Sequence, residues 1–145
     1  MDLAKFSSNL KSINPWKLLF PILKKVLPEI ADTNRVQLER GELSTGELMP
    51  EYKQEWYKEM KESLSTYKAP SGIPDLRVEG DFYDGLYADL DDNGIEFGST
   101  DEKESKLEAM YTEFIFGIQV AEWEAIKKDK ILPLWIEAIK REMFK

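Results

Sequence analysis

The sequence predicts an α+β fold, with helices at both termini packed on one side of a small central antiparallel sheet. Apolar residues recur at helical spacing near both ends of the chain, at 19–30 and 132–143. Between these segments, an Asn-Gly pair separates two runs of alternating apolar and polar residues, which is typical of a β-hairpin. The 145 residues fit a single domain, residues 1–145, with room for a sizeable core.

The N-terminal region reads as a short polar arm followed by a helix. Residues 1–14 are polar and mixed. Four apolar residues then recur at spacings of 3, 4 and 4 and share one helix face: Leu19, Ile22, Val26 and Ile30. Pro21 suits the first turn of this helix. Pro28 is expected to kink or split it, because the proline ring removes a backbone donor and clashes with the preceding turn.

A loop and a polar helix follow. Residues 41–50 hold two glycines and a proline, which predicts a loop. The stretch "PEYKQEWYKEMKESL" predicts a helix with Pro50 in its first turn and three large apolar residues at intervals of 4 and 4: Trp56, Met60 and Leu64. Residues 69–74 end that helix, and a short apolar run follows at 76–78.

The stretch "ADLDDNGIEFGSTD" at residues 88–101 allows two interpretations. As a hairpin, it places the apolar residues Phe82, Leu86, Ala88 and Leu90 on one face, with Ile95 and Phe97 resuming the alternation. Asp92-Asn93-Gly94 is then the turn, because Asn and Gly accept the positive φ of a type I′ turn.

The other interpretation is a calcium loop. Asp89, Asp91, Asn93 and Gly94 match the first half of the EF-hand pattern. Position 12 of that pattern needs a bidentate carboxylate and falls on Thr100. The hairpin is therefore the favoured interpretation of the 89–94 acidic turn, and no metal ligand is predicted.

The C-terminal region is predicted to be helical. Ser99, Thr100 and Asp101 offer caps before the helix-forming stretch "EKESKLEAMY". After Gly117 the pattern is helical, and four apolar residues share a face: Leu132, Ile136, Ile139 and Met143. Pro133 predicts a kink or restart between residues 128 and 133. Three tryptophans are interpreted as core or interface anchors: Trp16, Trp123 and Trp135.

Composition restricts the chemistry. The chain has no His and no Cys, which removes thiol nucleophiles, imidazole bases and the usual zinc ligand sets. An enzyme would have to use carboxylates in a dry cleft, and the candidates are Asp81, Asp84, Asp101 and Glu102. The 28 Asp and Glu residues make some close pair inevitable, so no catalytic residue and no cofactor is predicted.

Charge and hydropathy restrict the partners. The formal net charge is −8, which disfavours binding to the phosphates of nucleic acid. No apolar run reaches the length of a membrane span, and no signal peptide is recognised, so a soluble protein without membrane partners is expected. An acidic single domain without catalytic residues also fits a small inhibitor or immunity-type module that binds a basic partner.

Two segments then suggest a family. "NRVQLERGELSTGELMPEYKQ" at 34–54 and "EGDFYDGLYADLDDNGIEFGSTDEKESKLEAMYTEFIFGI" at 80–118 resemble small virion proteins of tailed bacteriophages that infect Bacteroides-type hosts, related in layout to neck or tail-completion proteins. The shared positions are Leu38, Gly41, Gly46-x-x-x-Pro50-x-Tyr52, Gly80-Asp81-Phe82-Tyr83, Ser99-Thr100-Asp101-x-Lys103, Leu107, Tyr111 and Ile115-Phe116-Gly117.

The resemblance implies a structural, non-enzymatic virion subunit that assembles as a homo-oligomeric ring at the portal-to-tail junction. Its expected partners are copies of itself and other portal, neck and tail proteins, and its expected location is the virion, assembled in the cytoplasm of the host bacterium. Residues 1–20 and 130–145 are suited to be an N-terminal arm and a C-terminal interface helix that reach a neighbour. An acidic surface would also suit a channel through which DNA slides without sticking.

Overall fold

The computed structural model describes residues 2–77, 81–102 and 104–145 and has the expected α+β architecture. Helices occupy both ends of the chain, and an antiparallel hairpin of two strands lies against the long second helix. The elements are α1 Leu3–Ser12, α2 Pro15–Glu39, α3 Glu55–Glu62, α4 Asp81–Asp84, β1 Leu86–Asp91, β2 Gly94–Ser99, α5 Glu104–Tyr111, the 3-10 turn η1 Glu113–Ile115, α6 Val120–Ile126, the π-helix η2 Lys127–Ile131 and α7 Leu132–Met143.

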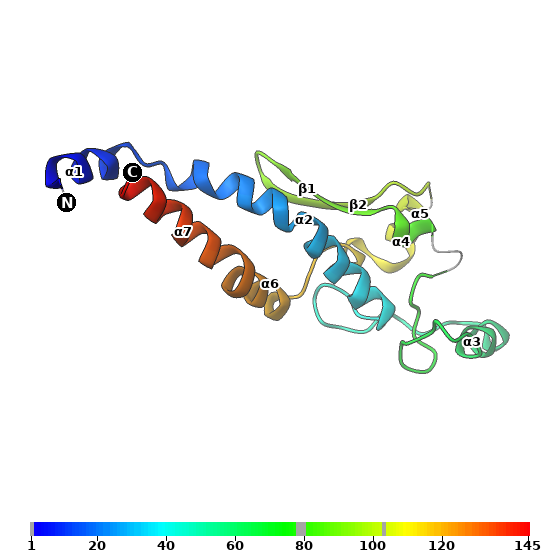
Figure 1. Cartoon of the computed structure of the whole chain (residues 1–145). Coiled ribbons are helices and arrows are strands. Elements are labelled where there is room, and N and C mark those ends of the chain that lie inside the picture. Colours follow the sequence, from blue (N-terminus) through cyan, green and yellow to red (C-terminus); the bar gives the residue numbers. More distant parts are fainter. Residues whose placement is uncertain (1, 78–80, 103) are drawn as a thin grey trace.

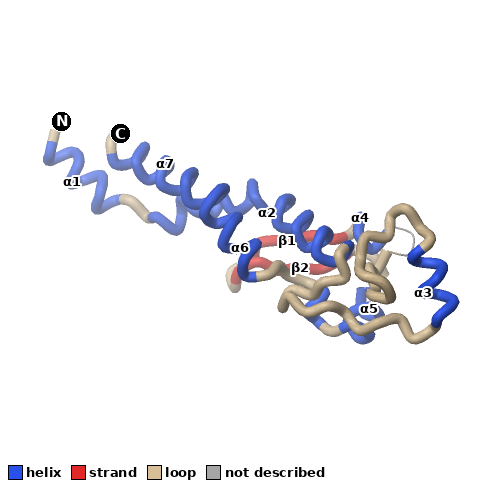
Figure 2. The backbone as a smooth tube through the Cα atoms, turned by 90° about the horizontal axis from the view of Figure 1, so that it is seen from below, coloured by secondary structure: helices blue, strands red, loops and turns tan. Residues whose placement is uncertain are grey.

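The molecule is elongated (Figure 1). Both termini lie at one end, where α7 runs beside the first half of α2 and α1 extends beyond the start of α2 to lie beside the end of α7, while α3 lies at the opposite end in both views (Figures 1 and 2). The hairpin and α6 lie between these ends. The two ends of the molecule are therefore far apart and present different surfaces.

The second helix confirms the predicted apolar face and corrects the predicted breaks. Ile22, Val26 and Ile30 are buried, and Asn14 caps the helix start by accepting a hydrogen bond from the Trp16 amide at 3.2 Å. Helix α2 nevertheless begins before Pro21 and is not split at Pro28.

Exposure explains why both prolines are tolerated. Pro21 and Pro28 lie on the solvent side of α2, as do the residues four positions earlier, Lys17 and Lys24. Water can therefore satisfy the carbonyls that lose their helical partners, while the buried face on the other side keeps the helix continuous.

The hairpin is confirmed, with a different turn from the predicted one. Asp91 pairs with Gly94, so Asp92 and Asn93 form the loop. Asp92 and Asn93 have no positive φ, so the turn is not type I′, although Gly94 has the positive φ expected of it, 134°. The Asp91 carboxylate accepts a hydrogen bond from the Asn93 amide at 2.7 Å, and this side-chain turn fixes the tip instead.

The predicted apolar face of the hairpin is also largely confirmed. Ala88 and Leu90 of β1 and Ile95 and Phe97 of β2 pack against buried residues of α2 and the C-terminal helices. Phe82 does not belong to the strand, because it lies in α4 and is buried in another part of the core.

The core has two clusters, and α2 contributes to both. The first cluster lies between the hairpin, α2 and the C-terminal helices, and comprises Ile22, Val26, Leu27, Ile30, Ile126 and Ile131. The second lies toward the α3 end and comprises Leu38, Leu43, Met49, Ile73, Leu76, Phe82, Tyr83 and Ile115. The 41–50 loop is confirmed and closes over the second cluster, helped by the positive φ of Gly41, where an added Cβ would meet Ile73 at 2.3 Å.

Two buried amide side chains join the clusters. Asn34 donates to the Ile115 carbonyl at 2.9 Å and accepts from the Gly117 amide at 3.2 Å. Gln37 donates to the Gly117 carbonyl at 3.0 Å and accepts from the Gln119 amide at 2.8 Å. One face of α2 therefore binds the 115–119 segment much as a neighbouring strand would.

The C-terminal helices follow the predicted restart. The π-helix η2 ends at Ile131, and α7 begins at Leu132 with Pro133 in its first turn. The predicted shared face of α7 is only partly covered, because Ile139 and Met143 are half-buried while Leu132 and Ile136 are exposed. Val78, the last residue of the predicted apolar run, and Gly80 and Lys103 of the phage-like pattern lie outside the described part of the chain.

Candidate functional site

Helix α3 turns its apolar face outward. The helix is shorter than the predicted one, beginning at Glu55 and not near Pro50. Trp56 and Met60 of α3 and Leu64, just after its end, which we call the α3 face, are 62%, 43% and 45% exposed. The buried residue of this helix is Lys61, and Tyr57 on the same side is half-buried. An exposed apolar helix face at the end of a molecule is typical of a surface that binds a partner.

A buried ion pair explains this orientation. Lys61 Nζ lies 2.7 Å from Asp75 Oδ1, and the two side chains are 3% and 2% exposed. The ammonium group also donates to the Arg77 carbonyl, and the Arg77 amide donates to Asp75 Oδ1 at 3.0 Å. Because these groups satisfy one another, the inward side of α3 is polar and the apolar side faces solvent.

Further contacts fix the chain around the pair. Leu76, between Asp75 and Arg77, has a φ of 58°, a strained value for a residue with a branched side chain. Arg77 lies over the Tyr83 ring at 4.8 Å and pairs with Glu39 at 3.1 Å. These contacts hold Leu76 in its strained conformation with its side chain in the core.

Tyr83 completes the network as a donor. Its hydroxyl donates to the Asp75 carbonyl. Burial, and then the nearby Asp75 carboxylate, raise the pKa of the Tyr83 phenol far above its ordinary range. The phenol therefore stays protonated and keeps its hydrogen bond. Lys61 and Asp75 are committed to internal partners, so the arrangement is an anchor for α3 and not a reactive site.

The opposite end of the molecule has a second exposed apolar surface. We call α1, the first half of α2 and α7 the terminal stem. No residue of α1 or α7 is buried, and their contacts include Phe6 stacked on Phe144 at 5.5 Å and Trp16 beside Trp135 at 5.8 Å. The exposed large apolar residues of the stem are Leu3, Leu10, Trp16, Phe20, Leu132, Leu134, Ile136 and Phe144.

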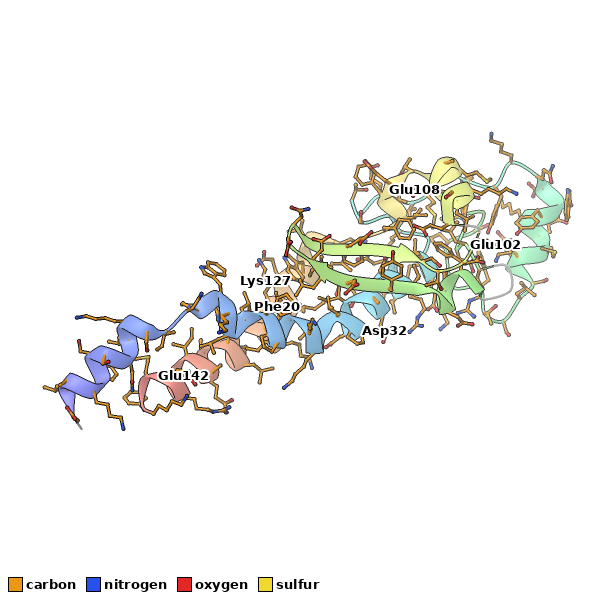
Figure 3. All side chains as sticks on the ribbon, turned by 90° about the horizontal axis from the view of Figure 1, so that it is seen from above. Phe20, Asp32, Glu102, Glu108, Lys127 and Glu142 are labelled. Atoms are coloured by element: carbon orange, nitrogen blue, oxygen red, sulfur yellow. The ribbon has the colours of Figure 1, made fainter. Side chains whose placement is uncertain are left out.

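An apolar groove lies between the stem and the hairpin. It has a volume of about 820 Å³ and is lined by side chains from α2, both strands and the C-terminal helices: Leu19, Leu23, Leu90, Ile95, Phe97 and Trp123. These residues are half-buried, because they pack on the first core cluster with one side and face the groove with the other. Lys127, Lys128 and Glu124 stand at its rim, and Figure 3 labels Lys127.

Three of the four carboxylates that the sequence offered for catalysis have described side chains, and these three do not meet in a cavity. Asp84 and Glu102 are exposed and Asp101 is half-buried, and none of these three lines the larger cavities. Glu102 lies toward the α3 end, away from Lys127 (Figure 3). The side chain of Asp81 lies outside the described set. Asp84, Asp101 and Glu102 therefore form no candidate active site among the described side chains.

The acidic turn has local partners. Asp89 accepts a hydrogen bond from the Leu90 amide at 2.8 Å, and Asp91 caps the turn as described above. Within residues 2–77, 81–102 and 104–145, no three acidic side chains gather closely enough to hold a metal ion. The turn is a hairpin tip.

The sequence pattern missed the anchor and the direction of the α3 face. The spacing of Trp56, Met60 and Leu64 marks an apolar face but carries no information on whether that face meets the chain's own core. Lys61 and Asp75 were two charges among 20 basic and 28 acidic residues, and no local pattern singles them out. The sequence predicts core or interface anchors at Trp16 and Trp135 of the stem, and Trp16 is 71% exposed.

No helix in the described ranges is long and apolar enough to cross a membrane. Comparison with known proteins finds no matching family model, no matching curated protein and no matching solved structure.

Proposed function

We propose that this chain is a non-enzymatic structural subunit that works by assembling with copies of itself into a ring. The observation that supports this most is the exposure of apolar side chains at both ends of the molecule, on the α3 face and on the terminal stem. Two different surfaces on one subunit suit head-to-tail contacts, which close into a ring when the rotation between neighbours allows it.

The resemblance of residues 34–118 to small phage virion proteins adds a location in the virion to this proposal. The ring is a neck or tail-completion component at the portal-to-tail junction of a tailed phage, and its further partners are portal, neck and tail proteins. The terminal stem is the surface that reaches such a neighbour, because it carries both chain ends. The net charge of −8 suits a ring through which DNA passes without binding tightly.

Sedimentation velocity over a range of protein concentrations tests the assembly. The full chain is expected to form species larger than a monomer as concentration rises, and electron microscopy of the largest species should show closed rings. A monomer at all concentrations, which does not join purified portal or neck proteins of its own phage, contradicts the proposal.

The same experiment distinguishes the ring subunit from a second candidate function, a small acidic inhibitor or immunity-type module. That reading is favoured by the net charge of −8, since an acidic domain can cover a basic site on a partner. An inhibitor would stay monomeric and bind one basic target in a salt-dependent manner. Self-association that persists at high salt supports the ring subunit instead.

A further inference from the structure

We infer that the α3 face of one copy docks into the apolar groove of the next copy, so that each subunit contributes a different surface to every contact. This inference rests on the proposed function, and it names the two surfaces that would meet. Helix α3 lies at one end of the molecule, whereas the groove lies between the hairpin and the terminal stem. A single copy therefore cannot fill its own groove.

The apolar chemistry of the two surfaces matches. Trp56 and Met60 lie one helical turn apart on α3, which is the spacing by which a helix inserts into a groove. Leu64 follows two residues after the helix ends. The groove volume of about 820 Å³ lies in the range of pockets that bind ligands in proteins. It has room for several side chains of one helix face.

The charges around the two surfaces are also complementary. On α3, Glu55, Glu59 and Glu62 are exposed, while Lys61 is buried in its ion pair. At the groove rim, Lys127 pairs with Glu124 at 2.7 Å, and Lys128 forms no ion pair with any described residue. Docking would place the α3 glutamates near the lysine-rich rim, which favours this register over a contact between two identical surfaces.

The expected strength of one contact is low. A buried tryptophan covers about 150–250 Å², and a specific interface needs about 1,000 Å² or more. The α3 face alone falls short of that area, so two copies should bind weakly. A closed ring makes the same contact at every subunit, and the last contact is intramolecular. Assembly should therefore be cooperative, with few intermediate species.

A mixing experiment tests the inference. Trp56→Asp removes the main apolar side chain of the α3 face, and Leu132→Asp places a charge at the exposed groove edge where α7 begins. Both positions are exposed, and an acidic residue suits the first turn of a helix, so both variants should fold. Each variant alone should self-associate at least about tenfold more weakly than the unchanged chain.

Mixing the two variants gives the decisive result. The intact α3 face of Leu132→Asp should fill the intact groove of Trp56→Asp, so the mixture should form a one-to-one dimer and nothing larger. Phe114→Asp, at an exposed aromatic residue outside both surfaces, is the matched control and should assemble like the unchanged chain. Far-UV circular dichroism and thermal unfolding check that every variant is folded.

Three outcomes have distinct meanings. If the unchanged chain assembles and both variants assemble equally well, the docking is wrong while the proposed function stands. If both variants are monomeric alone and their mixture shows no heterodimer even at concentrations far above those at which the unchanged chain assembles, where a single weak contact would still be populated, the two surfaces do not bind each other and the docking is likewise wrong. If the unchanged chain is monomeric alone and with its phage partners, the proposed function fails first.

Discussion

In the layer formed by α2 and the hairpin, apolar side chains face inward, whereas at α3 a lysine faces inward and a tryptophan faces solvent. Ile30 is fully buried and shares its cluster with the inner face of the strands. Lys61 is nearly as buried, but it is held by Asp75 and the Arg77 carbonyl. This difference shows that the apolar face of a helix does not always face the core. At α3 an ion pair occupies the buried side, and the apolar side is left exposed.

The largest expected effect comes from breaking the buried pair. Lys61→Met leaves the Asp75 carboxylate buried without its counter-charge, and the free energy of unfolding should fall by about 3–5 kcal/mol. Urea denaturation measures this loss. Adding Asp75→Asn should recover most of it, because the amide oxygen is neutral and can still accept the Arg77 amide hydrogen.

An exposed pair on the same chain provides the control. Arg141 and Glu137 lie 3.1 Å apart on α7 and are both well exposed, so Arg141→Met should change stability by less than about 0.5 kcal/mol. If Lys61→Met costs no more than Arg141→Met, the inward side of α3 is not anchored by charge, and α3 does not differ from α2 in what holds its buried side.

A smaller effect is expected from Tyr83→Phe, which removes the hydrogen bond to the Asp75 carbonyl. The loss should be about 1 kcal/mol near neutral pH. The phenol pKa is raised in the folded state, so its contribution to stability is fully present below the ordinary tyrosine pKa of about 10. It is lost as the pH rises above that value, because only the unfolded chain ionises there.

Unfolding curves measured at several alkaline pH values test this sign. The unchanged chain should lose stability more steeply above the ordinary tyrosine pKa than Tyr83→Phe does. A decline of equal slope in both proteins would show that Tyr83 titrates normally and is not enclosed by the α3 anchor.

The smallest effect is expected at the hairpin tip. Asp91→Ala removes the cap on the Asn93 amide and should cost about 0.5 kcal/mol or less, as for most exposed substitutions. Titration calorimetry with calcium should give no binding heat for the unchanged chain. Heat that disappears in Asp89→Ala and Asp91→Ala would make the acidic turn a cation site.

Periodicity predicted the parts of the fold in which the chain covers itself. The inner face of α2, the alternation along β1 and β2, and the restart before α7 all follow from spacing and proline chemistry. The turn of the hairpin was placed one residue late, because Asp91 fixes the tip through its side chain and no positive φ is needed at Asn93.

The remaining features depend on contacts between distant residues. Lys61 and Asp75 are brought together by the fold, and so are the amides of Asn34 and Gln37 with the 115–119 segment. No local rule reports such pairs, because each polar residue alone looks like a solvent-exposed one. The candidate surfaces were missed for the same reason, since a helical stripe of apolar residues looks identical whether it meets a core or a partner.

The continuity of α2 has a mechanical consequence. The helix has 25 residues and is about 37 Å long at 1.5 Å per residue. Apolar side chains near its middle pack in the core, and the amide side chains of Asn34 and Gln37 near its C-terminal end form hydrogen bonds with the 115–119 segment. A continuous helix that is held at two places moves as one rigid body. A displacement of the N-terminal half of α2 would therefore also displace the 115–119 segment, which Asn34 and Gln37 bind near the other end of the helix.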